Sequence, residues 1–478
     1  RDTDRSRGLG DVYKRQLQSR IISLLLVAML VLKNRKTTVN HSKKRWQDLL
    51  LNFRICLLNR MSLKMRLEES WGLLAMKFDD NELYSIPSSV NGTQCSLHNL
   101  AKWKNGLAFK KINFSDEGVP VIKIAELNNG IGPTTAYTKE IFSEDVHLKR
   151  GDLLFSWSGN PQTSIDTFRF DLEEGWLNQH IFKVTPNEEL VDFDYFYFLM
   201  KYLKPYFTKI ATNKQTTGLG HVTLADIKRM NLIVPDVETQ KRIVSVIKPI
   251  DDKIKLNNDI NNNLEQQAQA VYYKMFSEVN GEPVELSSII DVRDGTHDSP
   301  KAQATGYYLI TSKHLLPFGV DKASANRISK ADFDKINERS LVETQDILMS
   351  MIGTIGLISY IPYEAVDFAI KNMALFKTSH TPELTYYFLC YLKSEKTLQH
   401  IEKCLAGSTQ KYISLGELRK MPIYSPTTDE IREFNYLVKP MFEEIVSRTY
   451  ENALLAEMRD TLLPKLMSGE LDVSDIDL

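Results

Sequence analysis

Cysteine is scarce in this chain, and no sequence signature of a catalytic centre is present. The 478 residues include four cysteines, and these form no CxxC pair and no metal-ligand spacing with the nine histidines. We therefore expect free thiols in a reducing cytosol, with no disulfide framework and no metal site. A Walker A sequence, an HExxH motif, a nucleophile elbow and an Asn/Asp-Pro-Pro-Tyr/Phe methylation tetrapeptide are all missing. A chain of this length without such motifs is better explained as a binding protein than as an enzyme.

Basic charge is not in surplus either, since the formal net charge is −1. The first 77 residues hold 17 Lys/Arg against 6 Asp/Glu, whereas the remainder holds 43 against 55. The apolar run from Ile21 to Leu32 has 12 residues, too few for a membrane span of about 20 residues. We expect residues 1–77 to be a non-native or disordered extension, with a true start at Met61; a membrane anchor is the alternative. The protein is expected to be cytoplasmic and to bind no membrane.

The second half of the chain repeats the first. At offsets of 189 to 194 residues, the two copies share Gly106 and Gly295, Asn178 and Asn372, residues 221–230 and 412–421, and Pro235 and Pro426. Loop insertions account for the drift in offset, and the period is far longer than the roughly 50 residues of the largest solenoid units. The chain is therefore a tandem duplication of one domain.

Each copy ends in a long helical pattern. From about Glu238 to Phe276, and again after Pro426, one helix face follows alternating steps of four and three residues, the spacing of a helix that pairs with another. The two predicted faces are Ile243, Ile247, Ile250, Ile254, Asn257, Asn261, Leu264, Ala268, Val271 and Met275, and Phe434, Val438, Met441, Ile445, Arg448, Asn452, Leu455, Arg459, Leu462 and Leu466. Both are polar in the middle, and a buried polar layer fixes the register of a helix pair. We expect an antiparallel coiled coil about 57 Å long; the alternative is that both helices pack into one larger core.

Strand-like and helix-like segments recur before these helices, so the fold class is α+β with two tandem α/β pseudo-repeats. The expected strands are Val119–Ile124, Asp152–Ser156, Tyr307–Ile310 and Asp346–Ser350, and the expected aromatic helices are Phe193–Phe207 and Leu384–Leu398. The stripe Phe193, Tyr197, Met200 and Leu203 has helical spacing and is expected in the core. Trp157 is also expected in the core rather than at an interface.

Two loops with the same chemistry precede the long helices. Small hydroxyls, an amide, a lysine and a glycine can bring backbone N–H groups and a cation close to a phosphate, and glutamine can reach a base edge. The candidate DNA-binding residues of these loops are Lys214, Gln215, Thr216, Thr217, Ser408, Thr409, Gln410 and Lys411. Two further segments are candidates: Arg293 and His297 to read guanine, and Lys102, Lys104, Lys110 and Lys111 to hold a phosphate backbone.

Several motifs together resemble the specificity subunit of type I restriction–modification enzymes. The pattern Pro-x-x-x-x-Gln-x-x-Ile at Pro235 is followed by Asn-x-x-x-Asn-x-x-Leu-Glu at Asn257, and the chain closes with Leu-Leu-Pro-Lys-Leu-Met-Ser-Gly-Glu-Leu at residues 462–471. The second copy departs from the helix motif, since Ile431 replaces the glutamine and Arg448 the first asparagine. The resemblance covers residues 94–478.

This resemblance implies a non-catalytic DNA-recognition subunit. Each copy would be a target recognition domain that reads one half of an asymmetric, interrupted site, and the helices would set the spacing and dock methyltransferase subunits. Motor–nuclease subunits would join the complex, and the partners would use S-adenosylmethionine, ATP and Mg, with no cofactor in this chain. The domains implied are an extension (1–77), recognition domain 1 (78–235), a central helix (236–280), recognition domain 2 (281–425), and a final helix with a tail (426–478).

Two rival interpretations stay open at this point. One is the recognition module of a single-chain restriction–methylation enzyme, and the other is a coiled-coil scaffold that binds no DNA. Nucleic-acid binders usually carry a basic surplus, which residues 78–478 lack. We therefore expect the isolated chain to bind double-stranded DNA modestly and with a steep dependence on salt.

Overall fold

The computed structural model describes residues 84, 86, 90–132, 134–215, 218–276, 281–407, 411–474 and 476. The predicted extension at 1–77 lies outside these residues. The chain divides into two compact units, the first ending at Val246 and including Thr461 onwards, and the second running from Ile247 to Asp460. None of the helices in the described ranges combines the length and the apolar character that a membrane span requires.

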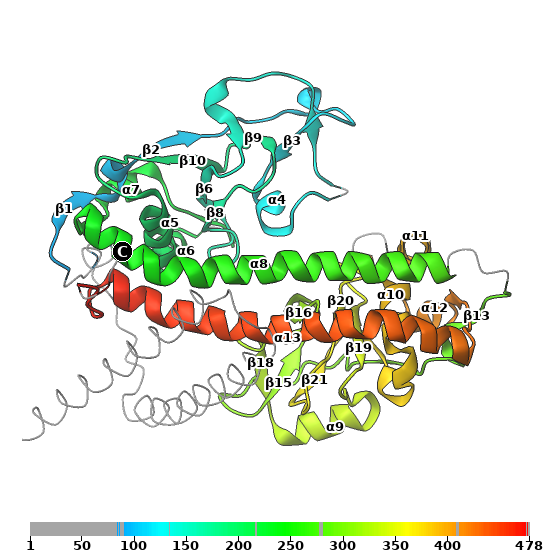
Figure 1. The fold of residues 1–478 in the computed structure, drawn as a ribbon. Coiled ribbons are helices and arrows are strands. Elements are labelled where there is room, and N and C mark those ends of the chain that lie inside the picture. The colour runs from blue at the N-terminus through cyan, green and yellow to red at the C-terminus, as the bar shows by residue number, and fades with distance from the viewer. Residues whose placement is uncertain are drawn as a thin grey trace, which may run out of the picture. The chain divides into compact units, whose positions relative to one another are not determined.

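Unit 1 is built on a four-stranded antiparallel sheet in the order β2-β10-β6-β8 (Figure 1). A second sheet has the order β4-β3-β9-β5, with β3 parallel to β9. The strands are β1 (Thr93–Ser96), β2 (Ala101–Asn105), β3 (Val119–Ile122), β4 (Tyr137–Thr138), β5 (His147–Lys149), β6 (Leu153–Ser156), β7 (Ser158–Gly159), β8 (Asp166–Arg169), β9 (Glu174–Leu177), β10 (Ile181–Pro186), β11 (Gly220–His221) and β12 (Asn231–Val234). The helices are η1 (Leu97–Leu100), η2 (Lys111–Asn113), α4 (Ile124–Asn129), η3 (Glu144–Val146), α5 (Phe193–Tyr202), α6 (Lys204–Asn213) and α7 (Leu224–Arg229).

Unit 2 repeats this plan. Its four-stranded sheet has the order β14-β22-β19-β20, and its second sheet the order β18-β15-β21, with β15 parallel to β21. The strands are β13 (Val284–Glu285), β14 (Val292–Asp294), β15 (Tyr307–Ile310), β16 (Leu315–Leu316), β17 (Gly319–Val320), β18 (Asn326–Ile328), β19 (Ile347–Ser350), β20 (Ile358–Tyr360), β21 (Phe368–Ile370), β22 (Met373–Phe376) and β23 (Pro422–Ile423). The helices are η4 (Leu286–Ser288), η5 (Ser312–His314), α9 (Lys330–Ser340), η6 (Thr378–His380), η7 (Pro382–Leu384), α10 (Thr385–Leu392), α11 (Glu395–Lys403) and α12 (Leu415–Arg419).

The predicted strands agree with β3, β6, β15 and β19 to within two residues at each end, but the prediction of one aromatic helix in each copy was wrong. Both are pairs of shorter helices. In the first copy, α5 ends at Tyr202 and α6 starts with Pro205 in its first turn, where a proline is tolerated because its missing N–H has no helical partner. In the second copy, Ser394 caps α11 by accepting a hydrogen bond from the N–H of Thr397. The stripe is buried at Met200 and Leu203 and half-buried at Phe193 and Tyr197.

The two long helices form as predicted. They are α8 (Val237–Phe276) and α13 (Thr428–Met467), each of 40 residues. Within unit 2, Asn257 of α8 is completely buried, and its Oδ1 accepts from Arg448 Nη1 at 2.9 Å while its Nδ2 donates to Asn452 Oδ1 at 2.8 Å. The polar residues expected opposite one another are therefore in contact.

Towards the end of α8, the buried face differs from the predicted one. Tyr272 and Phe276 are buried, whereas the predicted Val271 and Met275 are half-buried. The rings of Phe276 and Phe434 lie 5.4 Å apart, and the ring of Tyr387 on α10 lies 4.9 Å from that of Phe276. Here the helix packs against its own domain as well as against α13, so the alternative of a shared core holds for this stretch.

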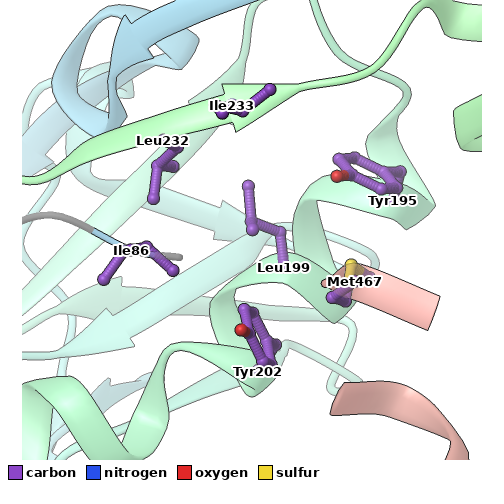
Figure 2. A pocket seen from close by; sticks show the side chains of 7 residues that line it. All are labelled: Ile86, Tyr195, Leu199, Tyr202, Leu232, Ile233 and Met467. Atoms are coloured by element: carbon purple, nitrogen blue, oxygen red, sulfur yellow. The ribbon is translucent and has the colours of Figure 1, made fainter. Parts of the chain in front are cut away.

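The end of α13, from Thr461 to Met467, belongs to unit 1. Met467 lines a small apolar hollow together with side chains from α5, β12 and the start of the described chain, as Figure 2 shows. The lining residues are Ile86, Tyr195, Leu199, Tyr202, Leu232, Ile233 and Met467. Its volume of about 10 Å³ is that of one water-sized sphere, so it is a packing defect rather than a ligand site.

Candidate nucleic-acid interface

In unit 1, four segments meet at one end of the four-stranded sheet. The end of β2 pairs with the start of β10, since Asn105 lies opposite Phe182, and the end of β6 lies opposite Ile181. Trp157, just after β6, donates its indole N–H to Asn105 Oδ1 at 3.0 Å. The short pair β7 and β11 places the loop before His221 beside this tryptophan. We call this end of the sheet the loop edge.

Unit 2 forms the same loop edge from the equivalent segments. The end of β14 pairs with the start of β22, and the end of β19 pairs with the same strand. The backbone N–H of Ile413 donates to the carbonyl of Met351 at 3.0 Å, which holds the second loop against the segment after β19. The loop itself is closed by two hydrogen bonds between the backbones of Ala406 and Tyr412.

A glycine in each copy lets a crossover between the two sheets approach the end of the first strand. A Cβ on Gly106 would lie 2.2 Å from the carbonyl oxygen of Asn178, and one on Gly295 would lie 2.5 Å from that of Ile370. No side chain fits at such distances, which explains why both copies keep glycine. Leu107 bridges Asn178, but Thr296 bridges Lys371. The alignment of Asn178 with Asn372 was therefore wrong by one residue, because the second crossover is one residue shorter.

Two predicted lysines of the first copy are held by carboxylates. Lys104 Nζ lies 2.8 Å from Asp145, and Lys214 Nζ lies 2.5 Å from Asp226, whose side chain is 2% exposed. Burial by itself raises the pKa of Asp226, but hydrogen bonds from Lys214 and Thr223 outweigh burial and lower that pKa below its ordinary value. Lys214 therefore stabilises the base of its loop.

The other predicted lysines of the first copy are spread out. Lys102 lies opposite Thr185, away from the loop edge. Lys110 and Lys111 are exposed at η2, where the amide of Asn113 donates to Glu140 at 2.9 Å, beside the second sheet. The structure does not gather these cations into one patch.

The predicted polar loops are described only in part. Gln215 and Lys411 are exposed, whereas Thr216, Thr217, Ser408, Thr409 and Gln410 lie outside the described residues.

In the second copy, Arg293 and His297 are fixed by neighbouring side chains. Arg293 pairs with Asp291 at 2.7 Å. The ring nitrogens of His297 lie 2.8 Å from Asn372 Oδ1 and 3.0 Å from Asp294 Oδ2, and Arg339 also pairs with Asp294. The loop edge of unit 2 is thus a small polar network.

Several residues of the loop edge were not predicted from the sequence or were expected elsewhere. Trp157 is half-buried there rather than in the core, and its ring lies 5.5 Å from that of His180. Leu219 and Tyr412 are large apolar side chains that remain 58% and 43% exposed. The sequence did contain a weak indication of this site, because the polar run Asn178-Gln-His180 directly follows a buried strand. No group of His, Cys, Asp and Glu suited to a metal ion occurs in the described part of the chain.

Comparison with known families identifies the duplicated domain. The family model of the type I restriction modification DNA specificity domain matches residues 93–266 and again residues 278–434. The chain therefore belongs to this family and carries two of its domains.

Individual relatives are similar along most of the chain. The type I restriction enzyme HindI specificity subunit of Haemophilus influenzae is 24% identical over 407 residues, which covers 68% of this chain and 87% of the relative. The EcoBI specificity subunit of Escherichia coli is 22% identical over 442 residues, covering 83% and 91%. The crystal structure of a type I S subunit from M. genitalium shares 14% identity, covers 79% of this chain and 96% of its own, and superposes with a TM-score of 0.43.

Proposed function

We propose that this protein is the DNA-recognition subunit of a type I restriction–modification complex, in which each copy reads one half of a bipartite, asymmetric site. The observation that carries this proposal is the loop edge, which recurs in both copies on the same strands but with different side chains. Asn105 and the residues around Trp157 form it in one copy, and Asp294 with His297 forms it in the other. One backbone frame with two sets of polar groups suits a target with two unlike halves.

The long helices have a separate part in this proposal. α8 and α13 pair as an antiparallel coiled coil that sets the distance between the half-sites and docks methyltransferase subunits. Contacts within unit 2 support the antiparallel direction: Asp251 pairs with Arg459, Asn257 with Asn452, and Phe276 contacts Phe434. Residue numbers thus rise along one helix as they fall along the other.

The polar layer of this helix pair supports a fixed register. Asn257 Oδ1 accepts from both Lys253 and Arg448, and its Nδ2 donates to both Glu451 and Asn452. All four hydrogen-bonding positions of a buried amide are satisfied, and a shift of the helices would leave these groups unpaired against aliphatic side chains.

Catalysis in this proposal belongs to other chains. Methyltransferase subunits would bind S-adenosylmethionine, and motor–nuclease subunits would use ATP and Mg, at sites of their own. This chain would direct them to double-stranded DNA in the cytoplasm.

The test is a genome-wide map of methylated adenines in a strain that carries this gene with the methyltransferase gene of the same system. We expect one motif with two different specific halves and a non-specific spacer of constant length, absent from a strain that lacks only this gene. A motif that persists without the gene would refute the proposal. Methylation with no sequence preference would favour the rival interpretation of a coiled-coil scaffold that binds no DNA.

A further inference from the structure

The crossover between the two sheets of unit 1 is a tight turn that presents two polar side chains at the loop edge. The backbone N–H of Ile181 donates to the carbonyl of Asn178 at 3.2 Å, so Gln179 and His180 are the two central residues of a β-turn. We call residues 178–181 the crossover turn. Neither central residue was among the candidates drawn from the sequence.

The backbone of the crossover turn is held from three sides. Asn178 N–H donates to the carbonyl of Ile122 in the second sheet at 3.1 Å. Gly106 N–H donates to the carbonyl of Ile181 at 3.1 Å, and Trp157 N–H donates to that of His180 at 3.3 Å. A turn fixed in this way places its side chains with little loss of backbone freedom on binding.

The side chains of the crossover turn are available to a ligand. His180 is exposed and Gln179 half-exposed, and no described residue hydrogen-bonds to the polar atoms of either side chain. The predicted candidates Lys104 and Lys214, by contrast, already pair with carboxylates. The Trp157 ring, fixed by its bond to Asn105, lies against the His180 ring and limits its rotation.

The equivalent turn in unit 2 has different chemistry. It is one residue shorter, and its side chains have partners within the protein: Lys371 Nζ lies 2.5 Å from Ser299 Oγ, and Asn372 contacts His297. Among the described residues of these two turns, an amide and an imidazole side chain without an internal partner occur only in the first copy. This difference matters because the two copies are proposed to read different sequences.

We propose that Gln179 and His180 read base edges in the major groove of the half-site bound by the first copy. This inference rests on the proposed function and names the residues that specify one half of the target. Gln179 matches the N6 and N7 edge of adenine, and one ring N–H of His180 can donate to the O6 or the N7 acceptor of guanine. The part of the target that they read is a pair of purines.

The experiment maps methylated adenines for the assembled complex with Gln179→Ala or His180→Ala. Each variant is expected to make one position of one half-site degenerate, with roughly 5- to 150-fold less discrimination at that base. The other half-site and the spacer should stay unchanged. The matched controls are Gln94→Ala on β1 and His98→Ala on η1, which precede β2 and lie away from the loop edge.

A gain-of-preference variant separates reading from folding. His180→Asn should shift the preferred base at its position from guanine towards adenine, since asparagine pairs with the adenine edge. A misfolded protein cannot acquire a new preference. The inference is overturned if both alanine variants keep the full wild-type motif, or if both half-sites weaken together. A wild-type chain that specifies no bipartite motif would instead overturn the proposed function.

Discussion

Each copy holds a lysine–aspartate pair between adjacent strands of its four-stranded sheet, but the two pairs differ in burial. Lys377 Nζ lies 2.6 Å from Asp346 in unit 2, with side chains 1% and 0% exposed. Lys183 Nζ lies 2.7 Å from Asp152 in unit 1, with side chains 20% and 24% exposed. The duplication therefore allows a lysine–aspartate pair to be compared in a fully buried and in a partly solvent-exposed environment.

We expect Lys377→Met to destabilise unit 2 by about 3–5 kcal/mol, because it leaves the Asp346 carboxylate buried without its cation. Lys183→Met should cost unit 1 only about 1 kcal/mol, since water reaches Asp152. In the double variant Lys377→Met, Asp346→Asn, part of the loss should be recovered, because no buried charge is left uncompensated; Glu343, the other carboxylate that pairs with Lys377, is 47% exposed. The recovery should be incomplete, because Glu343 N–H donates to Oδ2 of Asp346 and Ser379 N–H to Oδ1, and an amide keeps only one of these two acceptors.

The assay uses the uneven distribution of tryptophan along the chain. The five tryptophans all precede residue 177, and Trp103, Trp157 and Trp176 lie in unit 1, so tryptophan fluorescence in urea follows that unit. Hydrogen exchange read by mass spectrometry on peptides from β19 and β22 follows unit 2. Lys377→Met should raise exchange in those peptides and leave the fluorescence midpoint unchanged. If Lys377→Met cost no more than Lys183→Met, burial would not decide the strength of these pairs.

Four further outcomes follow from the geometry. Asn257→Leu should destabilise the contact between α8 and α13 by about 1–3 kcal/mol, because it leaves buried partners unsatisfied, whereas the exposed Asn263→Leu should not; exchange along both helices measures this. Gly106→Ala should cost unit 1 about 1–3 kcal/mol, read by tryptophan fluorescence, because its Cβ would meet the backbone of the crossover turn. The stability that wild type holds over Asp226→Asn should be present above pH 3.8 and lost as pH falls through the lowered pKa of Asp226, which urea midpoints against pH would show. The affinity of the complex for DNA should fall steeply with salt, and a flat plot of log K against log salt would exclude phosphate contacts.

The sequence predicted best those elements whose signal is local. The heptad spacing after Pro235 and Pro426 places α8 and α13 almost to the residue, because a long helix needs only a repeating pattern and a start. The four strands were recognisable as short apolar runs, and those at Asp152–Ser156 and Asp346–Ser350 are each followed within a few residues by a glycine. The aromatic helices were harder, since Pro205 and Ser394 each begin a second helix in a segment of continuous helical periodicity.

The candidate site was predicted less well because its contacts are not local. Lys214 and Asp226 are 12 residues apart and lie on opposite sides of the loop, so nothing in the local sequence indicates that the loop lysine pairs with a carboxylate. Likewise, Asn105 and Trp157 are 52 residues apart but share a hydrogen bond. Hydrogen-bonding groups with and without internal partners look the same in a sequence.

The residues of each copy fall into two groups. One group maintains the backbone frame that both copies share, and the other differs between the copies. Gly106 and Gly295 occupy the same close approach, and the lysine–aspartate pairs join the same strands. The central residues of the crossover turn, which directly follow the glycine contact at Asn178, differ between the copies in number, in residue type and in whether their side chains have internal partners. A change in the frame would disturb the packing of both sheets, whereas a change in the turn alters only exposed polar groups. If each copy reads one half-site as proposed, substitutions in the turn and loops of one copy should change the half-site read by that copy while the frame of both copies keeps its stability.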